Sequence, residues 1–284
     1  AIMIAAIARP QATVTLPSQH ETVILAMDVS GSMRATDVEP NRLVAAQNAA
    51  KAFINEQPDS VRVGIVAFAG TATVAQAPTS NKDDLVAAID RFQLQRATAI
   101  GSAILVSLAT LFPKDGIDVA TFGWGADQKG GKGKHDGAGR NTGPGNGKPA
   151  PPGSYQSAAI ILLTDGQRTT GPDSIAAARL AADKGVRVFT VGVGTPEGKI
   201  VGFEGWSMHV RLDEETLKAI ADITRGEYFY AGTAVDLKKI YESLNSRLVM
   251  ETKKTEVTAL FAAVAALLAT VAALLSLVWF NRIL

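Results

Sequence analysis

Short apolar runs alternate with amphipathic stretches along most of the chain, and this alternation predicts the order of its strands and helices. Each apolar run is rich in Val, Ile and Leu and is bounded by turn residues, as is typical of buried strands. One further strand follows its predecessor after only Ala69 and Gly70. That connection is too short for a crossover helix, so this strand should return antiparallel as an edge strand. The expected strands cover residues 22–27, 61–68, 71–76, 158–164, 186–193 and 227–230.

Helical periodicity fills the intervals between these strands, and several intervals carry local start and stop signals. Pro40 precedes the first helix, Asp213 can cap the fifth, and Gly185 and Gly226 close the helices before them. Strands that alternate with helices predict an α/β fold, namely a doubly wound, mostly parallel, Rossmann-like sheet with one antiparallel edge strand. The expected helices cover residues 42–55, 83–92, 100–111, 174–184, 214–224 and 234–251.

The C-terminal segment is apolar in a different way, because residues 257–280 carry no charge over 24 positions. Roughly 20 apolar residues span a bilayer, so the pattern predicts a C-terminal transmembrane helix rather than a buried core helix. Lys253 and Lys254 would flank one interface, and Trp279 and Phe280 the other. Residues 1–10 are apolar up to Arg9 and are expected to be the end of an upstream membrane helix, or otherwise of a signal sequence. The main domain is then residues 11–252.

Residues 115–156 break the pattern with many Gly, Lys and Pro residues that cannot bury a core. We expect a flexible insertion in the main domain. A phosphate-binding loop is rejected, because no Gly-x-x-x-x-Gly-Lys-Ser/Thr motif occurs there. A solvated loop is the preferred interpretation, and a basic loop that touches anionic lipid or a partner is the alternative.

Composition narrows the function classes. The 284 residues carry 28 basic and 27 acidic side chains, a net charge of +1 that favours no binding to nucleic acid. The absence of cysteine excludes disulfides, thiolate nucleophiles and thiolate metal sites. The histidines His20, His135 and His209 are far apart and lack the His-x-x-x-His spacing of a zinc site, so we expect neither a zinc ligand nor a general base among them.

A cluster of oxygen donors directly follows the first predicted strand. Asp28, Ser30 and Ser32 alternate with Val29 and Gly31, and Gly31 allows a tight loop that turns all three toward one point. Side chains at the carboxyl end of a strand lie where open α/β folds bind ligands. Carboxylate and hydroxyl oxygens are hard ligands that suit Mg²⁺, with Mn²⁺ or Ca²⁺ as alternatives. Taken alone the motif is weak, because Asp and Ser also form turns and caps.

Two further segments carry matching chemistry. Asp165 ends another apolar strand in the same way as Asp28. A carboxylate that leaves a buried strand costs stability unless something pairs with it, and two such groups at one sheet edge repel each other. A divalent cation would relieve that repulsion. Thr98 lies in a turn that enters a helix and, taken alone, would be interpreted as an N-cap.

Together these segments resemble the metal-ion-dependent adhesion site (MIDAS) of von Willebrand factor type A (VWA) domains, over roughly residues 21–251. Three separated motifs agree with one predicted topology, which makes the match specific. The resemblance implies an ion held by the two serines and by either Thr98 or Asp165, with waters bridging the rest. A coordination position would remain for a partner's carboxylate. The implied metal-site residues are Asp28, Ser30, Ser32, Thr98 and Asp165.

Within this superfamily the chain looks like bacterial Bat (aerotolerance) membrane proteins, on Asp37-Val-Glu-Pro-Asn-Arg42-Leu43, Gly192-Val-Gly-Thr195, residues 217–221 and Tyr228-Phe-Tyr230. That resemblance implies a bacterial inner-membrane location, an extracytoplasmic (periplasmic) VWA domain, and as partners a MoxR-type AAA+ ATPase and other membrane VWA proteins. Arg96 and Ala97 stand where the family often has Gly-Gly, and the insertion also departs from it.

The expected function is therefore that of a membrane-anchored, cation-dependent protein-binding module that coordinates an acidic residue of a partner, and not that of an enzyme. Two alternatives stay open. One is a metal-insertion or chaperone-type subunit that acts on a target enzyme. The other is a metal-dependent hydrolase, which would need a general base that the sequence does not offer.

Overall fold

The computed structural model describes residues 11–17, 22–117, 149–195, 198–203, 206–256 and 266–275. The chain divides into two units, of which the larger is Gln19–Ser246. The smaller unit combines Ala1–Ser18 with Arg247–Leu284.

A six-stranded sheet forms the centre of the larger unit, in the order β4-β3-β2-β5-β6-β9. Every residue of its two central strands, β2 (Thr22–Asp28) and β5 (Ala158–Thr164), is buried, which explains why both are continuous apolar runs. Five strands run parallel and β4 returns antiparallel at one edge, which confirms the predicted sheet. The other strands are β3 (Arg62–Phe68), β4 (Ala72–Thr79), β6 (Arg187–Val193) and β9 (Tyr228–Ala231).

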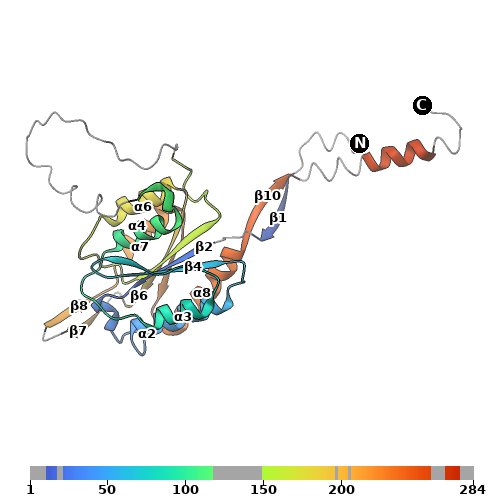
Figure 1. Ribbon diagram of the computed structural model, residues 1–284. Coiled ribbons are helices and arrows are strands. Elements are labelled where there is room, and N and C mark those ends of the chain that lie inside the picture. Colours follow the sequence, from blue (N-terminus) through green and yellow to red (C-terminus); the bar gives the residue numbers. More distant parts are fainter. Residues whose placement is uncertain are drawn as a thin grey trace, which may run out of the picture. The chain divides into compact units, whose positions relative to one another are not determined.

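Helices cover both faces of this sheet, so the doubly wound arrangement is confirmed (Figure 1). The predicted cap of α7 is confirmed, because the side chain of Asp213 accepts from the Thr216 amide. The first helix is capped by the side chain of Asn41, which directly follows Pro40. One face carries α4 (Ile100–Leu111), α6 (Ser174–Asp183) and α7 (Glu214–Thr224), and the other carries α2 (Arg42–Glu56), α3 (Lys82–Asp90) and α8 (Ala234–Val249).

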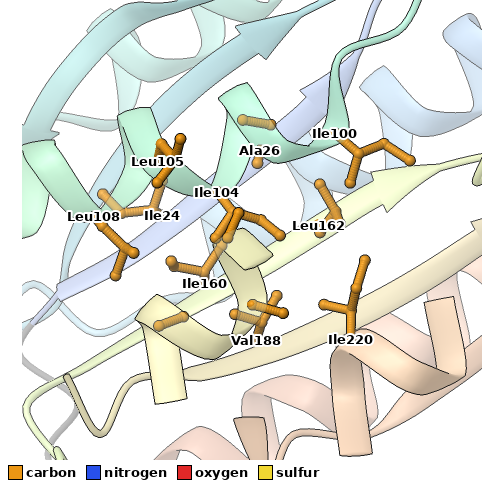
Figure 2. Packing of buried hydrophobic residues seen from close by; sticks show 14 of the residues in the cluster. Ile24, Ala26, Ile100, Ile104, Leu105, Leu108, Ile160, Leu162, Val188 and Ile220 are labelled. Atoms are coloured by element: carbon orange, nitrogen blue, oxygen red, sulfur yellow. The ribbon is translucent and has the colours of Figure 1, made fainter. Parts of the chain in front are cut away.

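The core follows the two-residue alternation of the strands. Ile24 and Ala26 of β2 point toward the face of α4, α6 and α7, where they pack with Ile104 of α4 and Leu162 of β5 (Figure 2). These residues are fully buried. This packing fixes β2 and β5 as rigid neighbours, so the residues that leave their carboxyl ends are held in fixed positions.

The sequence did not predict several elements. A hairpin formed by β7 (Lys199–Phe203) and β8 (Trp206–Val210) follows β6 in the larger unit, where a short 3₁₀ helix η1 (Gly31–Arg34) also follows β2. In the smaller unit, β1 (Gln11–Pro17) pairs antiparallel with β10 (Met250–Glu256). The last helix therefore ends at Val249, before the predicted residue 251, and a strand follows it.

The predicted membrane anchor is wrong. Within the described parts of the chain, no helix combines the length and the apolar character needed to cross a bilayer. Of residues 257–280, the structure describes a helix only over 266–275, and such a helix rises about 15 Å against a hydrocarbon core of about 30 Å. The prediction assumed that all of the uncharged residues 257–280 form one helix. This finding contradicts the predicted C-terminal span and the inner-membrane location, with a periplasmic domain, that the Bat resemblance implied. Residues 1–10 lie outside the described residues.

The predicted insertion lies partly outside the described residues, namely over 118–148. Its described C-terminal part contacts the end of α6 and the turn that follows. The Ala150 amide donates to the Asp183 carbonyl at 2.8 Å, and the Tyr155 amide donates to the Gly185 carbonyl at 2.9 Å. Residues 149–156 are thus tied to the domain, and the flexibility of 118–148 stays a prediction.

Candidate metal site

The two aspartates predicted for the site lie at the same edge of the sheet. Asp28 is the last residue of β2, and Asp165 directly follows the last residue of β5. The two strands pair in parallel with Met27 opposite Leu163, so they end at the same level. Both aspartates are fully buried, at 0% exposure. The carboxyl ends of two neighbouring strands thus bring two acidic side chains into one buried place.

Neighbouring donors fix the Asp28 carboxylate. The Ser30 amide donates to Oδ1 at 2.8 Å, and the Thr164 hydroxyl donates to Oδ2 at 2.5 Å. The first bond closes the loop after β2, and the second bond crosses from β5 to β2. Each oxygen therefore has one donor, and the side chain cannot turn away from Asp165 without losing one of these hydrogen bonds.

The serine hydroxyls of the first motif come together as predicted. Their Oγ atoms lie 2.8 Å apart, and Ser30 and Ser32 are 2% and 7% exposed. The turn into η1 produces this approach, because Ser30 precedes that helix and Ser32 lies in its first turn. The Ser32 side chain also hydrogen-bonds to Asp165. The structure therefore connects the first motif to the third.

Thr98 lies in a loop that is bound to the segments on either side of it. The carbonyl of Thr98 accepts from the Thr169 and Thr170 amides at 3.0 and 3.2 Å, in the loop after β5. On the other side, the Gln95 amide donates to the Val29 carbonyl at 2.8 Å, between Asp28 and Ser30. Thr98 is 4% exposed and does not cap α4, because Ala99 occupies the N-cap position.

Burial and mutual repulsion dominate the electrostatics of the two aspartates. Burial, and next the negative charge of Asp165, raise the pKa of Asp28 from 3.8 to about 7. Burial also raises the pKa of Asp165, against the opposing effects of the Ser32 hydrogen bond and the Arg42 charge. Two carboxylates that cannot both ionise at low cost form a place that favours an added positive charge.

Arg42 and Asp37 also belong to the site, although neither was predicted as a site residue from the sequence. Arg42 is fully buried, and its Nη1 donates to Oδ2 of Asp165 at 3.3 Å. Its Nε and Nη2 donate to the two oxygens of Asp37, at 2.8 and 2.6 Å. Burial opposes ionisation of Asp37, but the hydrogen bonds from Arg42, the charge of Arg42 and the Thr195 donors together lower the pKa of Asp37 to about 2. Both residues lie in the segment Asp37–Leu43, on which the Bat resemblance partly rests. That resemblance was the only sequence feature that could have pointed to them.

The donor set suits a hard divalent cation. Two carboxylates and the hydroxyls of neighbouring serines are oxygen ligands of the kind that Mg²⁺ and Mn²⁺ prefer. In the described residues, no three His, Cys, Asp or Glu side chains gather into a group that could hold a metal. A metal at this edge would therefore depend on the hydroxyls as well as on Asp28 and Asp165.

Comparison with known proteins agrees with this fold. Two family profiles, each described as von Willebrand factor type A domain, match residues 23–125 and 150–243. UPF0353 proteins from Mycobacterium marinum and Mycolicibacterium vanbaalenii are each 38% identical, over 253 and 259 residues. These matches cover 87% and 89% of this chain but 66% and 68% of the relatives. The chain thus spans about two thirds of the length of these relatives.

Solved structures lead to the same conclusion. BatB from Bacteroides thetaiotaomicron matches with a TM-score of 0.58 and 26% identity, over 80% of this chain and 98% of that one. Proximal thread matrix protein 1 from the mussel byssus, in a structure with a zinc-occupied MIDAS motif, shares the fold with a TM-score of 0.54. Its identity is 21%, over 86% of this chain and 50% of that one. The chain therefore belongs to the von Willebrand factor type A domain family and is similar to the UPF0353 and BatB proteins within it.

Proposed function

We propose that this domain is a divalent-cation-dependent protein-binding module. Its metal would be held by Asp28, Ser30, Ser32, Thr98 and Asp165. The observation that carries this proposal is the pair of fully buried aspartates at the ends of β2 and β5. In a site without metal, burial and repulsion penalise their charges, and a cation with a charge of +2 would remove most of that penalty.

The arrangement supports binding rather than bond-breaking chemistry. The Ser30 and Ser32 hydroxyls contact each other, and Asp28 accepts from a backbone amide and from Thr164. Each of these groups is engaged in holding the loop. A water-activating hydrolase needs in addition a free base beside the ion, and nothing in this set of contacts provides one.

A bound ion would recruit an acidic side chain of the partner. If only one of the two aspartates binds the ion directly, the ion keeps electrophilic character, so a partner's carboxylate can complete its coordination. The similarity to BatB supports a partner of the kind expected for Bat proteins, a MoxR-type AAA+ ATPase. In the mussel protein a MIDAS motif is occupied by zinc, which supports a metal at the same place in this fold, while the oxygen donors here favour Mg²⁺ or Mn²⁺.

Capture of a partner tests this function. The purified domain would be immobilised and exposed to a candidate MoxR-type ATPase in Mg²⁺ and in EDTA, with Asp28→Ala as the variant and Asp90→Ala as a surface control. Asp90 is the exposed last residue of α3 and pairs with Lys51 on α2. The proposal predicts capture that depends on Mg²⁺ and on Asp28 but not on Asp90. Equal capture in Mg²⁺ and EDTA would reject a metal-dependent interface.

A further inference from the structure

Arg42 places a permanent positive charge directly behind the candidate metal site. It is among the largest fully buried side chains in the structure. Its guanidinium has two sides with different partners: Nε and Nη2 face Asp37, whereas Nη1 faces Oδ2 of Asp165 at 3.3 Å. A guanidinium stays charged at every accessible pH. Asp165 therefore has a cationic partner even when no metal is present.

The position of the guanidinium is fixed from behind by the end of β6. Gly194 has a φ of +121°, and a Cβ added there would lie 2.4 Å from Cζ of Arg42. Only glycine leaves room for the guanidinium to lie against this backbone. Next to it, the Thr195 amide and hydroxyl donate to Oδ2 of Asp37, at 3.1 and 3.2 Å. The guanidinium is therefore held between β6 and Asp165.

We propose that Arg42 is a positioning residue that competes with the divalent cation for the Asp165 carboxylate. This inference rests on the proposed function and adds a rule for the affinity of the site. Arg42 holds Asp165 in place without metal, and it weakens the attraction of Asp165 for an ion. Metal binding is then weaker than two free aspartates would give, so occupancy of the site depends on the free ion concentration.

The charge of Asp37 determines how strongly this competition acts. The negative charge of Asp37 lies on the side of the guanidinium that faces away from Asp165. Arg42 and Asp37 therefore form a dipole whose positive end faces the metal site. Removing the whole Arg42–Asp37 pair removes that positive end. Removing only the charge of Asp37 leaves the full guanidinium charge acting on Asp165. The two changes should therefore move metal affinity in opposite directions.

The opposite changes in metal affinity can be measured by isothermal titration calorimetry, with Mg²⁺ or Mn²⁺ alone as the probe. The double variant Arg42→Met/Asp37→Asn replaces a buried ion pair by neutral groups, a change that folded proteins often tolerate. It should bind Mg²⁺ about tenfold more tightly than the wild type. Asp37→Asn keeps Arg42 and should bind Mg²⁺ several-fold more weakly. Circular dichroism would establish that both variants are folded.

A matched control removes one positive charge elsewhere. Arg62 begins β3 at the opposite end of the strands from Asp28, and its Nη2 donates to the Thr22 hydroxyl. Arg62→Met should leave Mg²⁺ affinity unchanged. If Arg42 only stabilised the fold, both test variants would weaken binding, and that result or unchanged affinity would overturn the inference. If the wild type showed no Mg²⁺ binding that Asp28→Ala abolishes, the proposed function itself would fail, and the inference with it.

Discussion

The Thr164 hydroxyl donates to Oδ2 of Asp28 at 2.5 Å and thereby joins the carboxyl ends of two neighbouring parallel strands. Its acceptor is the fully buried carboxylate of Asp28. It links a residue of β5 to a residue of β2 that is 136 positions away in sequence. The hydrogen bond therefore belongs both to the fold and to the site.

Thr164→Val should destabilise the metal-free domain, because it keeps the side-chain shape and removes the donor to a buried carboxylate. Leaving such an acceptor unpaired costs about 1–3 kcal/mol. Thr73→Val on the exposed part of β4 is the matched control and should change stability little. Urea unfolding in EDTA measures both variants. Equal stability of Thr164→Val and the wild type would show that this bond contributes nothing.

The metal-free domain should lose stability as pH rises. The pKa of Asp28 is about 7 in the folded chain against an ordinary value of 3.8, mainly because of burial and then of repulsion from Asp165. Between these values the folded state binds a proton that the unfolded state has released, so the free energy of unfolding falls with increasing pH over that window. Unfolding in EDTA from about pH 4 to about pH 8 would measure this slope.

Asp28→Asn provides the control for the pH experiment, because it removes the titrating group and keeps its size. The downward slope should be smaller in this variant. Mg²⁺ should restore the stability of the wild type most strongly near the upper end of the range, since the carboxylates are ionised there and Mg²⁺ does not have to displace a proton. A wild-type stability that rises over the whole window would contradict the assigned direction of the shift.

Ala97→Gly should stabilise the domain. Ala97 has a φ of +66°, in the left-handed region where a Cβ costs roughly 1–2 kcal/mol, and its side chain is exposed. Glycine removes that cost, although its more flexible unfolded chain offsets part of the gain. The control Ala87→Gly lies within α3 and is also exposed; it should destabilise by about 1 kcal/mol. Melting temperatures that shift in the same direction in both variants would contradict this interpretation.

Gly101→Ala should destabilise the domain, although alanine favours helix by about 1 kcal/mol over glycine. A Cβ at position 101 would lie 2.3 Å from the carbonyl oxygen of Pro172, so the helix and the loop after β5 would have to separate. That loop also contacts the Thr98 carbonyl through Thr169 and Thr170. We therefore expect a lower melting temperature together with weaker Mg²⁺ binding. A higher melting temperature of Gly101→Ala would show that the loop at Pro172 can move away from the helix at little cost.

The sheet could be predicted from the sequence because its strands are short, apolar and separated by clear turn and helix signals. The helices α4 and α7 were predicted with their observed bounds, and β5 likewise. The first and third metal motifs could be found because both follow such strands directly. Their convergence needed only the rule that parallel strands end at one edge.

Other features could not be inferred because they depend on long-range pairing. The partner of β1 is β10, near the opposite end of the sequence, and Lys253 and Lys254 of β10 were instead interpreted as membrane flanks. Arg42 and Asp165 are 123 positions apart. The local pattern of apolar and polar residues does not predict that an arginine is buried. The β7–β8 hairpin was not predicted for another reason: Trp206–Val210 alternates apolar and polar residues, but Lys199–Phe203 does not, so no pair of strands stood out.

Calorimetric titration of Mg²⁺ into the metal-free domain tests the central claim most directly, with wild type and Asp28→Ala compared at the same pH. We expect saturable binding to the wild type and a matching rise in its melting temperature by mass action. Both effects should be lost in Asp28→Ala, which should remain folded. Saturable binding of equal affinity in both proteins, or none in the folded wild type, would contradict a cation site built on Asp28 and Asp165.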